Sequence, residues 1–435
     1  MEFWQKDKEC IDRKVLKEIQ LEQLQKLINR LYSDVPFYRQ KMLDTGIKPE
    51  DIRSLDDVRY LPFTEKQDLR DNYPFGLFAV PKEEIIRFHA SSGTTGKPTV
   101  AAYTKRDLDN WADIMARDLS CAGINKSSVV QVSYGYGLFT GGLGMHYGVE
   151  RLGATVIPAS GGNTARQIQL IKDFNVTTIC CTPSYALNLA DYINEHGINI
   201  KDFSLRTGIF GAEPWTDHMR NEIENQLHIK AHDIYGLTEI MGPGVAMECE
   251  FNQGLHIWED AFYPEIVDEK GQVLPDGEEG ELVITTLQKE AMPLLRYRTH
   301  DITRLIAQPC PCGRTHRKIE KVKMRTDDML IVRGVNVFPS QAETLLMHIE
   351  GIRPQFRLTV DRIKNLDTLL VEVELDNRLI GDTVKDLENL RNKVAKTLSE
   401  GLLVRCDVKL LPTGSLSQGE NKFQRVVDLR KARQL

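Results

Sequence analysis

The amino-acid sequence predicts an α/β protein: a large N-terminal domain with mainly parallel sheets plus an antiparallel subdomain, then a small α+β domain at the C-terminal end. From Ile85 to about Val283, short apolar runs alternate with amphipathic helical stretches, which is typical of parallel sheets covered by helices. After Trp258 the strand-like runs follow one another without helices. At 435 residues the chain is also too long for one ordinary core, so more than one domain is expected.

The first element is helical. Apolar residues recur close to a 3.6-residue period within residues 10–45, at positions that include Ile19, Leu24, Leu27 and Ile28. The pattern predicts an amphipathic helical segment ahead of the first strand.

The alternating region supplies the parallel sheet. Its strand candidates are short, largely apolar runs, and its helix candidates are longer and carry charges on one face. The strands are expected at residues 128–133, 154–159, 176–182 and 206–211. Helices are expected at 164–175, between the second and third strands, and at 216–227, after the last.

The pattern of predicted secondary structure changes near residue 256. Strand-like runs there are joined by the turns "DEKG" and "PDGEEG", which predict an antiparallel subdomain over about 256–324. A new strand-then-helix pattern begins with "DDMLIVRGVNVFPSQAETLLMHI" and continues to the end of the sequence. We therefore expect one domain over residues 1–324 and a second over 325–435.

Composition excludes several classes of protein. The formal net charge is -6, which argues against nucleic acid as a partner because nucleic-acid-binding proteins usually present a basic face. No apolar run is long enough to cross a membrane, and the charged N-terminus does not resemble a signal peptide. We expect a cytoplasmic protein whose 8 cysteines stay reduced, so that clustered cysteines are better read as metal ligands.

The stretch "SSGTTGKPT" has the residue types of a phosphate-binding loop. Glycines permit backbone angles that turn successive amides toward an anion, and hydroxyls and a lysine add further donors. The residue order differs from the common nucleotide-binding pattern G-x-x-x-x-G-K-[ST], so the phosphate-binding mechanism of that pattern is not assumed. The alternative is a polar turn. The residues concerned are Ser91, Ser92, Gly93, Thr94, Thr95, Gly96 and Lys97.

Two later stretches add acidic groups suited to a nucleotide. "HDIYGLTEIMGPG" places Tyr235, Thr238 and Glu239 after a predicted strand, and a glutamate near a triphosphate commonly holds Mg²⁺. "RYRTHD" ends a predicted strand with Asp301, a residue type that can chelate ribose hydroxyls. Either carboxylate taken alone is more often an ordinary surface group.

An aromatic, glycine-rich stretch, "YGYGLFTGGLG", is a candidate for an apolar ligand pocket. Tyr134, Tyr136 and Phe139 lie on a backbone that can approach a flat ring closely. The alternative is a buried loop that fills the core.

Four residues have the chemistry of a structural Zn²⁺ site. Cys249 and His256 lie in "ECEFNQGLH", and Cys310 and Cys312 lie in "PCPCGRTH". Three thiolates and an imidazole can close a tetrahedral site, and reduced thiolates favour zinc. The spacings are looser than those of common zinc fingers, and the alternative is four residues that never meet.

Taken in order, "SSGTTGKPT", "GAEPW", "YGLTE", "RYRTHD" and "RTDDMLIVRGVNVFPSQ" resemble the adenylate-forming superfamily of acyl-CoA synthetases. The stretches "SYGYGLFTGGLGMHYG", "KEAMPLLRYRTHD" and "CPCGRTHRKIE" are similar to those of its phenylacetate–coenzyme A ligases, from about Trp4 to Leu429. The resemblance implies that ATP and an aryl-acetic acid form an acyl-adenylate with release of pyrophosphate. Coenzyme A then takes the acyl group and AMP leaves. The resemblance also implies a possible homodimer.

The resemblance assigns roles to single residues. Residues 91–97 would hold the β- and γ-phosphates, with Lys97 as a catalytic group, and Glu239 would hold Mg²⁺. The remaining nucleotide contacts would come from Gly211, Ala212, Glu213, Asp233, Ile234, Tyr235 and Thr238 around the adenine and its neighbourhood, and from Asp301 and Arg325 at the ribose. Tyr134, Tyr136 and Phe139 would contact the acid.

In this family the small C-terminal domain is mobile, swinging between an adenylation and a thioester-forming pose. Asp327 matches the pivot, although Met324 stands where the pattern usually has glycine. Lys422 matches the catalytic lysine, although Asn421 replaces the preceding glycine, and a surface lysine is the alternative. Two other functions remain open: adenylation of an aryl acid for a carrier protein, and a non-catalytic nucleotide-binding regulator.

Overall fold

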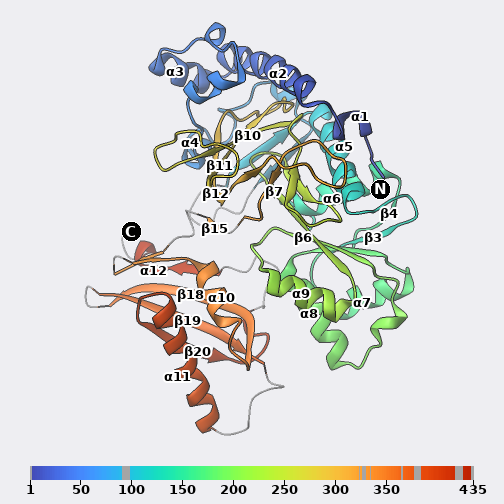
Figure 1. The fold of residues 1–435 in the computed structure, drawn as a ribbon, viewed down its shortest axis with the longest axis vertical. Helices are drawn as coiled ribbons and strands as arrows, with labels where there is room; N and C mark the ends of the chain where they lie inside the picture. The colour runs from blue at the N-terminus through green and yellow to red at the C-terminus, as the bar shows by residue number, and fades with distance from the viewer. Residues whose placement is uncertain are drawn as a thin grey trace. The chain divides into compact units, whose positions relative to one another are not determined.

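The computed structural model describes residues 2–90, 98–322, 324–325, 330–333, 335–363, 366–376, 384–416 and 425–432. Its contacts divide the chain into two compact units. The first comprises Met1–Glu213 with Ile223–Val322, and the second comprises Pro214–Glu222 with Lys323–Leu435. Figure 1 shows the elements of each unit.

The chain begins with helices, as the sequence predicts. After the short α1 (Lys6–Glu9), α2 (Arg13–Asp34) and α3 (Pro36–Thr45) occupy the region with helical periodicity, and α4 (Lys66–Asp71) follows. The Asp12 carboxylate caps α2 by accepting the Lys14 N–H at 2.8 Å. The apolar face of α2 is buried in the core of the first unit.

A nine-stranded sheet forms the centre of the first unit. Five neighbouring strands run parallel: β7 (Lys230–Leu237), β6 (Thr207–Gly211), β5 (Thr178–Cys181), β3 (Val129–Val132) and β4 (Thr155–Ile157). The sheet continues beyond β7 through antiparallel strands: β8 (Gly242–Glu248), β9 (Leu255–Ile257), β14 (Lys318–Ile319) and β13 (Leu305–Ile306). The predicted parallel sheet is therefore present, and an antiparallel extension completes it.

Helices accompany the parallel strands, as the alternating pattern predicts. They are α5 (Lys105–Cys121), α6 (Gly141–Leu152), α7 (Thr164–Asp173), α8 (Pro183–Glu195) and α9 (Asp217–Leu227). Glycines let α6 approach α5 closely, because a Cβ at Gly144 would lie 2.5 Å from the Trp111 ring and a Cβ at Gly148 would lie 2.4 Å from the Met115 Cβ.

Two smaller sheets also belong to the first unit. Strands β10 (Phe262–Val267), β11 (Gly280–Thr286) and β12 (Tyr297–Thr303) pair antiparallel in sequence order. Strands β1 (Arg87–Ala90) and β2 (Val100–Tyr103) form an antiparallel pair on either side of the "SSGTTGK" stretch. The region after Trp258 thus supplies strands both to the large sheet and to a sheet of its own.

The second unit is an α+β structure with its own core. A four-stranded sheet has the order β20 (Cys406–Leu411), β19 (Leu366–Leu375), β18 (Ile352–Ile363), β21 (Val426–Asp428). The other elements are β15 (Met324–Arg325), β16 (Leu330–Val332), β17 (Val335–Val337), α10 (Pro339–Leu346), α11 (Val384–Gly401) and α12 (Leu429–Ala432). Buried residues such as Phe356, Val371 and Leu398 join the sheet to the helices. Among the described residues of both units, no helix has the length and apolar character of a membrane span.

Candidate active site

The large sheet brings two predicted nucleotide-binding segments together. Strands β6 and β7 are parallel neighbours, with Gly211 opposite Ile234. Ligands of open α/β sheets bind beside the carboxyl ends of such strands. Gly211 allows close approach there, because a Cβ at this position would lie 2.4 Å from the Ile234 carbonyl oxygen. Ala212 follows with a positive φ of 67°, which turns the chain sharply at the strand end.

A hydrogen bond connects this edge to the sheet of β10–β12. The Tyr235 hydroxyl donates to Asp301 Oδ2 at 2.6 Å, and the Asp301 side chain is buried. Both residues lie inside strands, since β7 continues to Leu237 and β12 continues to Thr303, whereas the sequence suggested that one followed a strand and the other ended one. Asp233 is also buried within β7.

Glu213 caps a helix. Its Oε1 accepts the Ser184 N–H at 2.7 Å in the first turn of α8, beside the N-cap residue Thr182. A carboxylate suits this position because the helix N-terminus carries partial positive charge. The structure therefore gives Glu213 a local role, whereas contact with adenine stays a prediction.

The turn that carries Glu239 is held by side chains from three other segments. This β7–β8 turn, residues 238–241, contains the buried Glu239. Thr238 Oγ1 lies 3.3 Å from Thr140 Oγ1, and the Tyr103 hydroxyl donates to the Met241 carbonyl at 2.7 Å. Lys289 Nζ donates to the Ile240 carbonyl at 2.9 Å. The turn is thus anchored on both sides of Glu239.

Lys289 was missed by sequence reasoning. It lies in "KEAMPLL", where a lysine before an apolar run looks like an ordinary surface residue. Burial lowers the pKa of its ammonium group to about 8, while the nearby carboxylates of Asp107 and Glu239 act in the opposite direction. A buried lysine whose pKa is shifted in this way is a candidate for a functional residue.

The aromatic side chains of the "YGYGLFTGGLG" stretch differ in how deeply they are buried. The Tyr134 hydroxyl donates to the Cys181 carbonyl at 2.7 Å, and burial raises the pKa of this phenol well above its usual value. The Tyr136 hydroxyl lies 3.3 Å from His146 Nδ1. Phe139 is 44% exposed. Tyr134 thus packs partly against the core, while Phe139 keeps a surface to which a ligand could bind.

His89 is a second residue that the sequence did not single out. It is buried two residues before the start of the "SSGTTGK" stretch, and its Nδ1 lies 3.0 Å from the Leu138 carbonyl oxygen. Its ring meets those of Tyr103 and Trp111 edge to face. The only sequence signal that could have pointed to His89 is its place shortly before the glycine-rich stretch.

Several predicted residues lie outside the described part of the chain. Ser91, Ser92, Gly93, Thr94, Thr95, Gly96, Lys97, Asp327 and Lys422 belong to this group. Arg325 is described and half-buried in β15 of the second unit. The roles of all these residues stay predictions.

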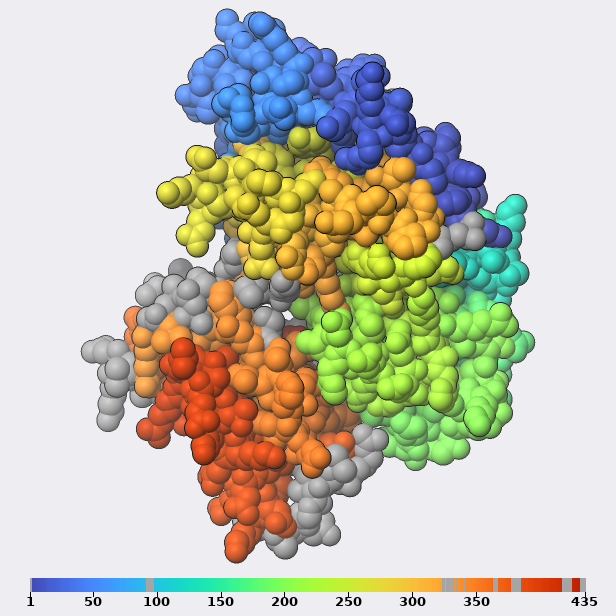
Figure 2. Space-filling model, viewed as in Figure 1, coloured from blue at the N-terminus to red at the C-terminus, as the bar shows by residue number. Residues whose placement is uncertain are grey.

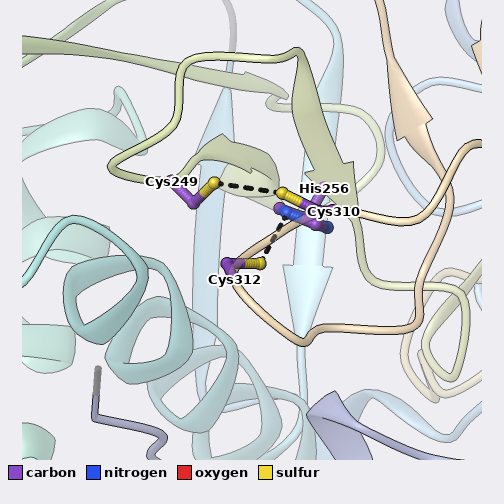
Figure 3. Close-up of side chains that lie close together, drawn as sticks. All are labelled: Cys249, His256, Cys310 and Cys312. Atoms are coloured by element: carbon purple, nitrogen blue, oxygen red, sulfur yellow. Dashed lines mark hydrogen bonds between the residues drawn. The ribbon is translucent and has the colours of Figure 1, made fainter.

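The four candidate zinc ligands meet in one buried cluster (Figure 3). Their ligand atoms all lie within 4.8 Å of one another. The Sγ atoms of Cys249 and Cys310 are 3.6 Å apart, and Cys312 Sγ lies 3.3 Å from His256 Nε2. Cys249 follows β8, His256 lies in β9, and both other cysteines lie on the segment between β13 and β14. The alternative that these residues never meet is therefore wrong.

The electrostatics of the cluster favour a metal ligand set. A hydrogen bond with Cys249 lowers the pKa of the Cys312 thiol, and His256 lowers it further, against the effect of burial. His256 Nδ1 lies 3.4 Å from the His316 carbonyl oxygen, to which it can donate. This leaves Nε2 as the nitrogen that faces the cysteines, the arrangement usual for a metal-bound histidine.

The N-terminal residues pack beside the cluster. Arg314 Nε donates to Glu9 Oε2 at 2.8 Å, and both side chains are fully buried. His316 Nε2 lies 2.9 Å from the Lys8 carbonyl oxygen, and the Thr315 N–H donates to the Glu9 carbonyl at 3.1 Å. In Figure 2 the dark-blue N-terminal residues lie against orange residues of the first unit.

Comparisons with known proteins agree with this architecture. The family model described as AMP-binding enzyme matches residues 20–288, and the model described as AMP-binding enzyme C-terminal domain matches residues 334–430. The chain is 51% identical over 419 residues to a phenylacetate-coenzyme A ligase of Pseudomonas putida, covering 96% of this chain and 95% of the relative. It is 48% identical over 444 residues to a phenylacetate-coenzyme A ligase of Thermus thermophilus, covering 99% and 100% respectively.

Solved structures extend the likeness to the fold. A 2-hydroxyisobutyryl-CoA ligase in the postadenylation state, in complex with 2-HIB-AMP, has a TM-score of 0.89 and 28% sequence identity. The alignment covers 98% of this chain and 92% of that one. The ligase in complex with 2-HIB-AMP and CoA has a TM-score of 0.73 and 29% identity, over 98% of this chain and 93% of that one.

Proposed function

The chain belongs to the AMP-binding enzyme family and, within it, to the phenylacetate–coenzyme A ligases; from that membership we propose that it ligates phenylacetate or a related aryl-acetic acid to coenzyme A. The observation that carries the proposal is identity near one half along almost the full length of relatives with this activity. ATP supplies the energy, and AMP and pyrophosphate are the products.

The reaction has two steps. A carboxylate oxygen of the acid attacks the α-phosphorus of ATP, and the bond to the β-phosphate oxygen breaks, which releases pyrophosphate and leaves an acyl-adenylate. The sulfur of coenzyme A then attacks the acyl carbon, loses its proton, and expels AMP. The first step makes the second possible because AMP is a far better leaving group than oxide. Catalysis of such steps depends mainly on positioning and on stabilising charge.

The residues at the edge of β6 and β7 suit the nucleotide. Asp301 would accept hydrogen bonds from the ribose hydroxyls, and the Tyr235 hydroxyl would orient its carboxylate from one side. Gly211–Glu213 and Asp233–Tyr235 would flank the adenine, since they lie at the carboxyl ends of the neighbouring strands β6 and β7. Residues 91–97 and Arg325 would add the phosphate and ribose contacts implied by the family.

Glu239 suits a Mg²⁺ ion. It is a buried carboxylate on an anchored turn, and Mg²⁺ prefers a few carboxylate oxygens together with phosphate oxygens. When bound, the ion would neutralise phosphate charge during nucleotidyl transfer. Thr238 would support the turn through Thr140.

The aryl group of the acid would bind at the aromatic loop. Tyr136 and Phe139 offer ring surface beside the chain that leads to α6, and Tyr134 supports the loop through its bond to the Cys181 carbonyl. These residues would select an aromatic acid by apolar contact.

Zn²⁺ would occupy the Cys249–His256–Cys310–Cys312 cluster as a structural ion. Four protein ligands fill a tetrahedral shell and leave no position for water, which is the pattern of structural sites. Metal analysis of protein purified without added zinc should find about one ion per chain. The Cys310→Ser, Cys312→Ser double variant should have lost it, and equal, negligible zinc in both proteins would contradict the site.

Pyrophosphate exchange tests the function. Labelled pyrophosphate should enter ATP when phenylacetate or a close relative is present, and AMP release should then depend on coenzyme A. An aliphatic acid of similar size is the control. Absence of exchange with every aryl acid would favour a non-catalytic nucleotide-binding protein. Exchange without coenzyme A-dependent AMP release would favour another acceptor, such as a carrier protein.

A further inference from the structure

A short stretch of the chain joins the candidate zinc cluster to the N-terminal residues. Residues 310–316, here called the metal loop, carry Cys310 and Cys312 at one end. Their other end contacts residues 2–11, here called the N-terminal segment. Gly313 turns the chain between the two ends with a positive φ of 85°, a conformation that favours glycine. The metal loop therefore contacts the cluster and the N-terminal segment at the same time.

Arg314 makes the first connection. Its backbone N–H donates to Cys312 Sγ at 3.5 Å, so this residue contacts a candidate zinc ligand directly. Its guanidinium group donates from Nε to Glu9 Oε2 at 2.8 Å and from Nη2 to the Glu2 carbonyl at 3.3 Å. The guanidinium carbon lies 4.8 Å from the centroid of the Phe3 ring. The side chains of Arg314 and Glu9 are both fully buried, so water does not compete for their contact.

His316 makes the second connection. Its Nδ1 accepts the backbone N–H of Glu259 at 3.0 Å, which leaves Nε2 as the protonated nitrogen of the neutral ring. Nε2 therefore donates to the Lys8 carbonyl at 2.9 Å. On the cluster side, the His316 carbonyl accepts from His256 Nδ1 at 3.4 Å. One residue thus contacts both a candidate zinc ligand and the N-terminal segment.

Thr315, between these two residues, adds contacts that do not involve the cluster. Its backbone N–H donates to the Glu9 carbonyl at 3.1 Å, and its hydroxyl donates to the Ile11 carbonyl at 2.6 Å. On its other side the N-terminal segment binds α5, where Arg117 Nε donates to Gln5 Oε1 at 2.7 Å. The N-terminal segment therefore links the metal loop to α5.

We propose that metal binding at the cluster and docking of the N-terminal segment are coupled. With Cys312 and His256 held as ligands, the metal loop keeps the conformation that binds the N-terminal segment, and the docked segment in turn slows release of the metal. Such coupling is reciprocal, because two linked equilibria must shift one another by the same factor. The inference rests on the zinc site proposed above and gives residues 2–11 a role in metal retention.

Zinc release from the full-length protein tests one half of this coupling. Zinc-loaded protein is mixed with excess pyridylazoresorcinol, and the coloured zinc complex is followed in time. Glu9→Gln should speed release about tenfold or more, because the buried Arg314 side chain loses the carboxylate that holds it and the metal loop opens more often. Thr315→Val removes only the hydroxyl that binds the Ile11 carbonyl and should speed release about threefold.

Glu265→Gln is the matched control for general destabilisation. Glu265 and Arg296 form another buried pair in the first unit, with Nη2 2.9 Å from Oε1. Arg296 also donates to the carbonyls of Arg59 and Leu61, so this pair supports a different part of the unit. The control should lower the free energy of unfolding about as much as Glu9→Gln does, yet change zinc release by less than about twofold.

Limited proteolysis tests the reciprocal half. Trypsin should cut zinc-loaded wild-type protein slowly after Lys6 and Lys8, since both residues lie in the docked helix α1. Removal of zinc with a chelator should speed cleavage there about tenfold, and added zinc should restore protection. Cleavage after Lys270, in the exposed turn that follows β10, is the internal control and should not change.

Two results would overturn the coupling while the metal site stands. One is zinc release at the wild-type rate from the folded Glu9 and Thr315 variants, and the other is cleavage of the N-terminal segment that does not depend on zinc. Thermal melting identifies a variant that does not fold, and Thr315→Val then carries the comparison if Glu9→Gln fails. A wild-type protein that neither contains zinc nor binds added zinc would overturn the proposed site and the coupling together.

Discussion

Asp118 shows how burial can dominate the protonation of a single residue. Its Oδ1 accepts the Trp258 Nε1–H at 2.7 Å, whereas Oδ2 is buried without a hydrogen-bond partner among the described residues. Burial raises the pKa of this carboxyl well above its usual value. The group is therefore protonated in the folded protein under conditions where it ionises in the unfolded chain.

We expect Asp118→Asn to become more favourable as the pH rises. The folded wild-type protein keeps a proton that the unfolded chain releases above about pH 4, so wild-type stability falls as pH rises toward the folded-state pKa. Asparagine carries no such proton and can still accept the Trp258 hydrogen bond. The difference in free energy of unfolding should shift toward the variant by at most about 1.4 kcal/mol per pH unit. Denaturant unfolding at pH 5 and pH 7 checks this, and a difference that does not change with pH would contradict it.

Lys422 carries a separate residue-scale prediction from the family pattern. Lys422→Ala should lower acid-dependent pyrophosphate exchange about 100-fold, because a positioned positive charge is lost from the adenylation step. Formation of the thioester from supplied acyl-adenylate should remain close to wild type. Assays of the two half-reactions check this, and an equal loss in both would show that Lys422 has been misassigned.

At the scale of elements, the buried Arg314–Glu9 pair fastens α1 to the segment that holds Cys310 and Cys312. Both side chains are fully buried, so Glu9→Gln removes the carboxylate to which Arg314 donates and leaves the buried guanidinium with less compensating negative charge. Glu9→Gln should lower the free energy of unfolding by about 3 kcal/mol. The measurement is denaturant unfolding followed by the tryptophan signal.

The exposed Lys105–Asp109 pair provides the control for that change. It is an i,i+4 pair on α5 whose side chains are 72% and 43% exposed. Lys105→Met should cost less than about 0.5 kcal/mol, since water already screens the pair. If Glu9→Gln costs no more than this control, the buried pair does not stabilise the N-terminal segment.

The sequence predicted the type of each element better than its first and last residues. The apolar runs predicted β3, β5 and β6 within a residue or two, because a buried parallel strand reads as an apolar run in any surroundings. The ends of β7 and β12 were set too early, since their last residues pair with β8 and β11, and the local apolar pattern does not reveal this pairing. The pairing partner, not local propensity, determines where such a strand ends.

At the scale of the whole molecule, the two-domain organisation leads to a prediction about the proposed pivot. Asp327→Pro should restrict backbone rotation at this position, because proline fixes φ. Thioester formation from supplied acyl-adenylate should fall about tenfold, with a smaller effect on pyrophosphate exchange. Exchange by the same variant serves as its internal control, and unchanged thioester formation would contradict a pivot at this residue.

The sequence by itself determined the family and the α/β class, because ordered motifs and apolar periodicity are local properties of the chain. It also named Tyr235, Glu239 and Asp301 as candidate site residues. It also named Cys249, His256, Cys310 and Cys312, but not whether they meet. Only the tertiary structure decided that they do, that the Tyr235 hydroxyl binds Asp301, and that Lys289 is buried beside the Glu239 turn. Each of these contacts joins strands or loops far apart in the sequence, and such proximity depends on how β-strands pair and on which groups lose water when the core closes.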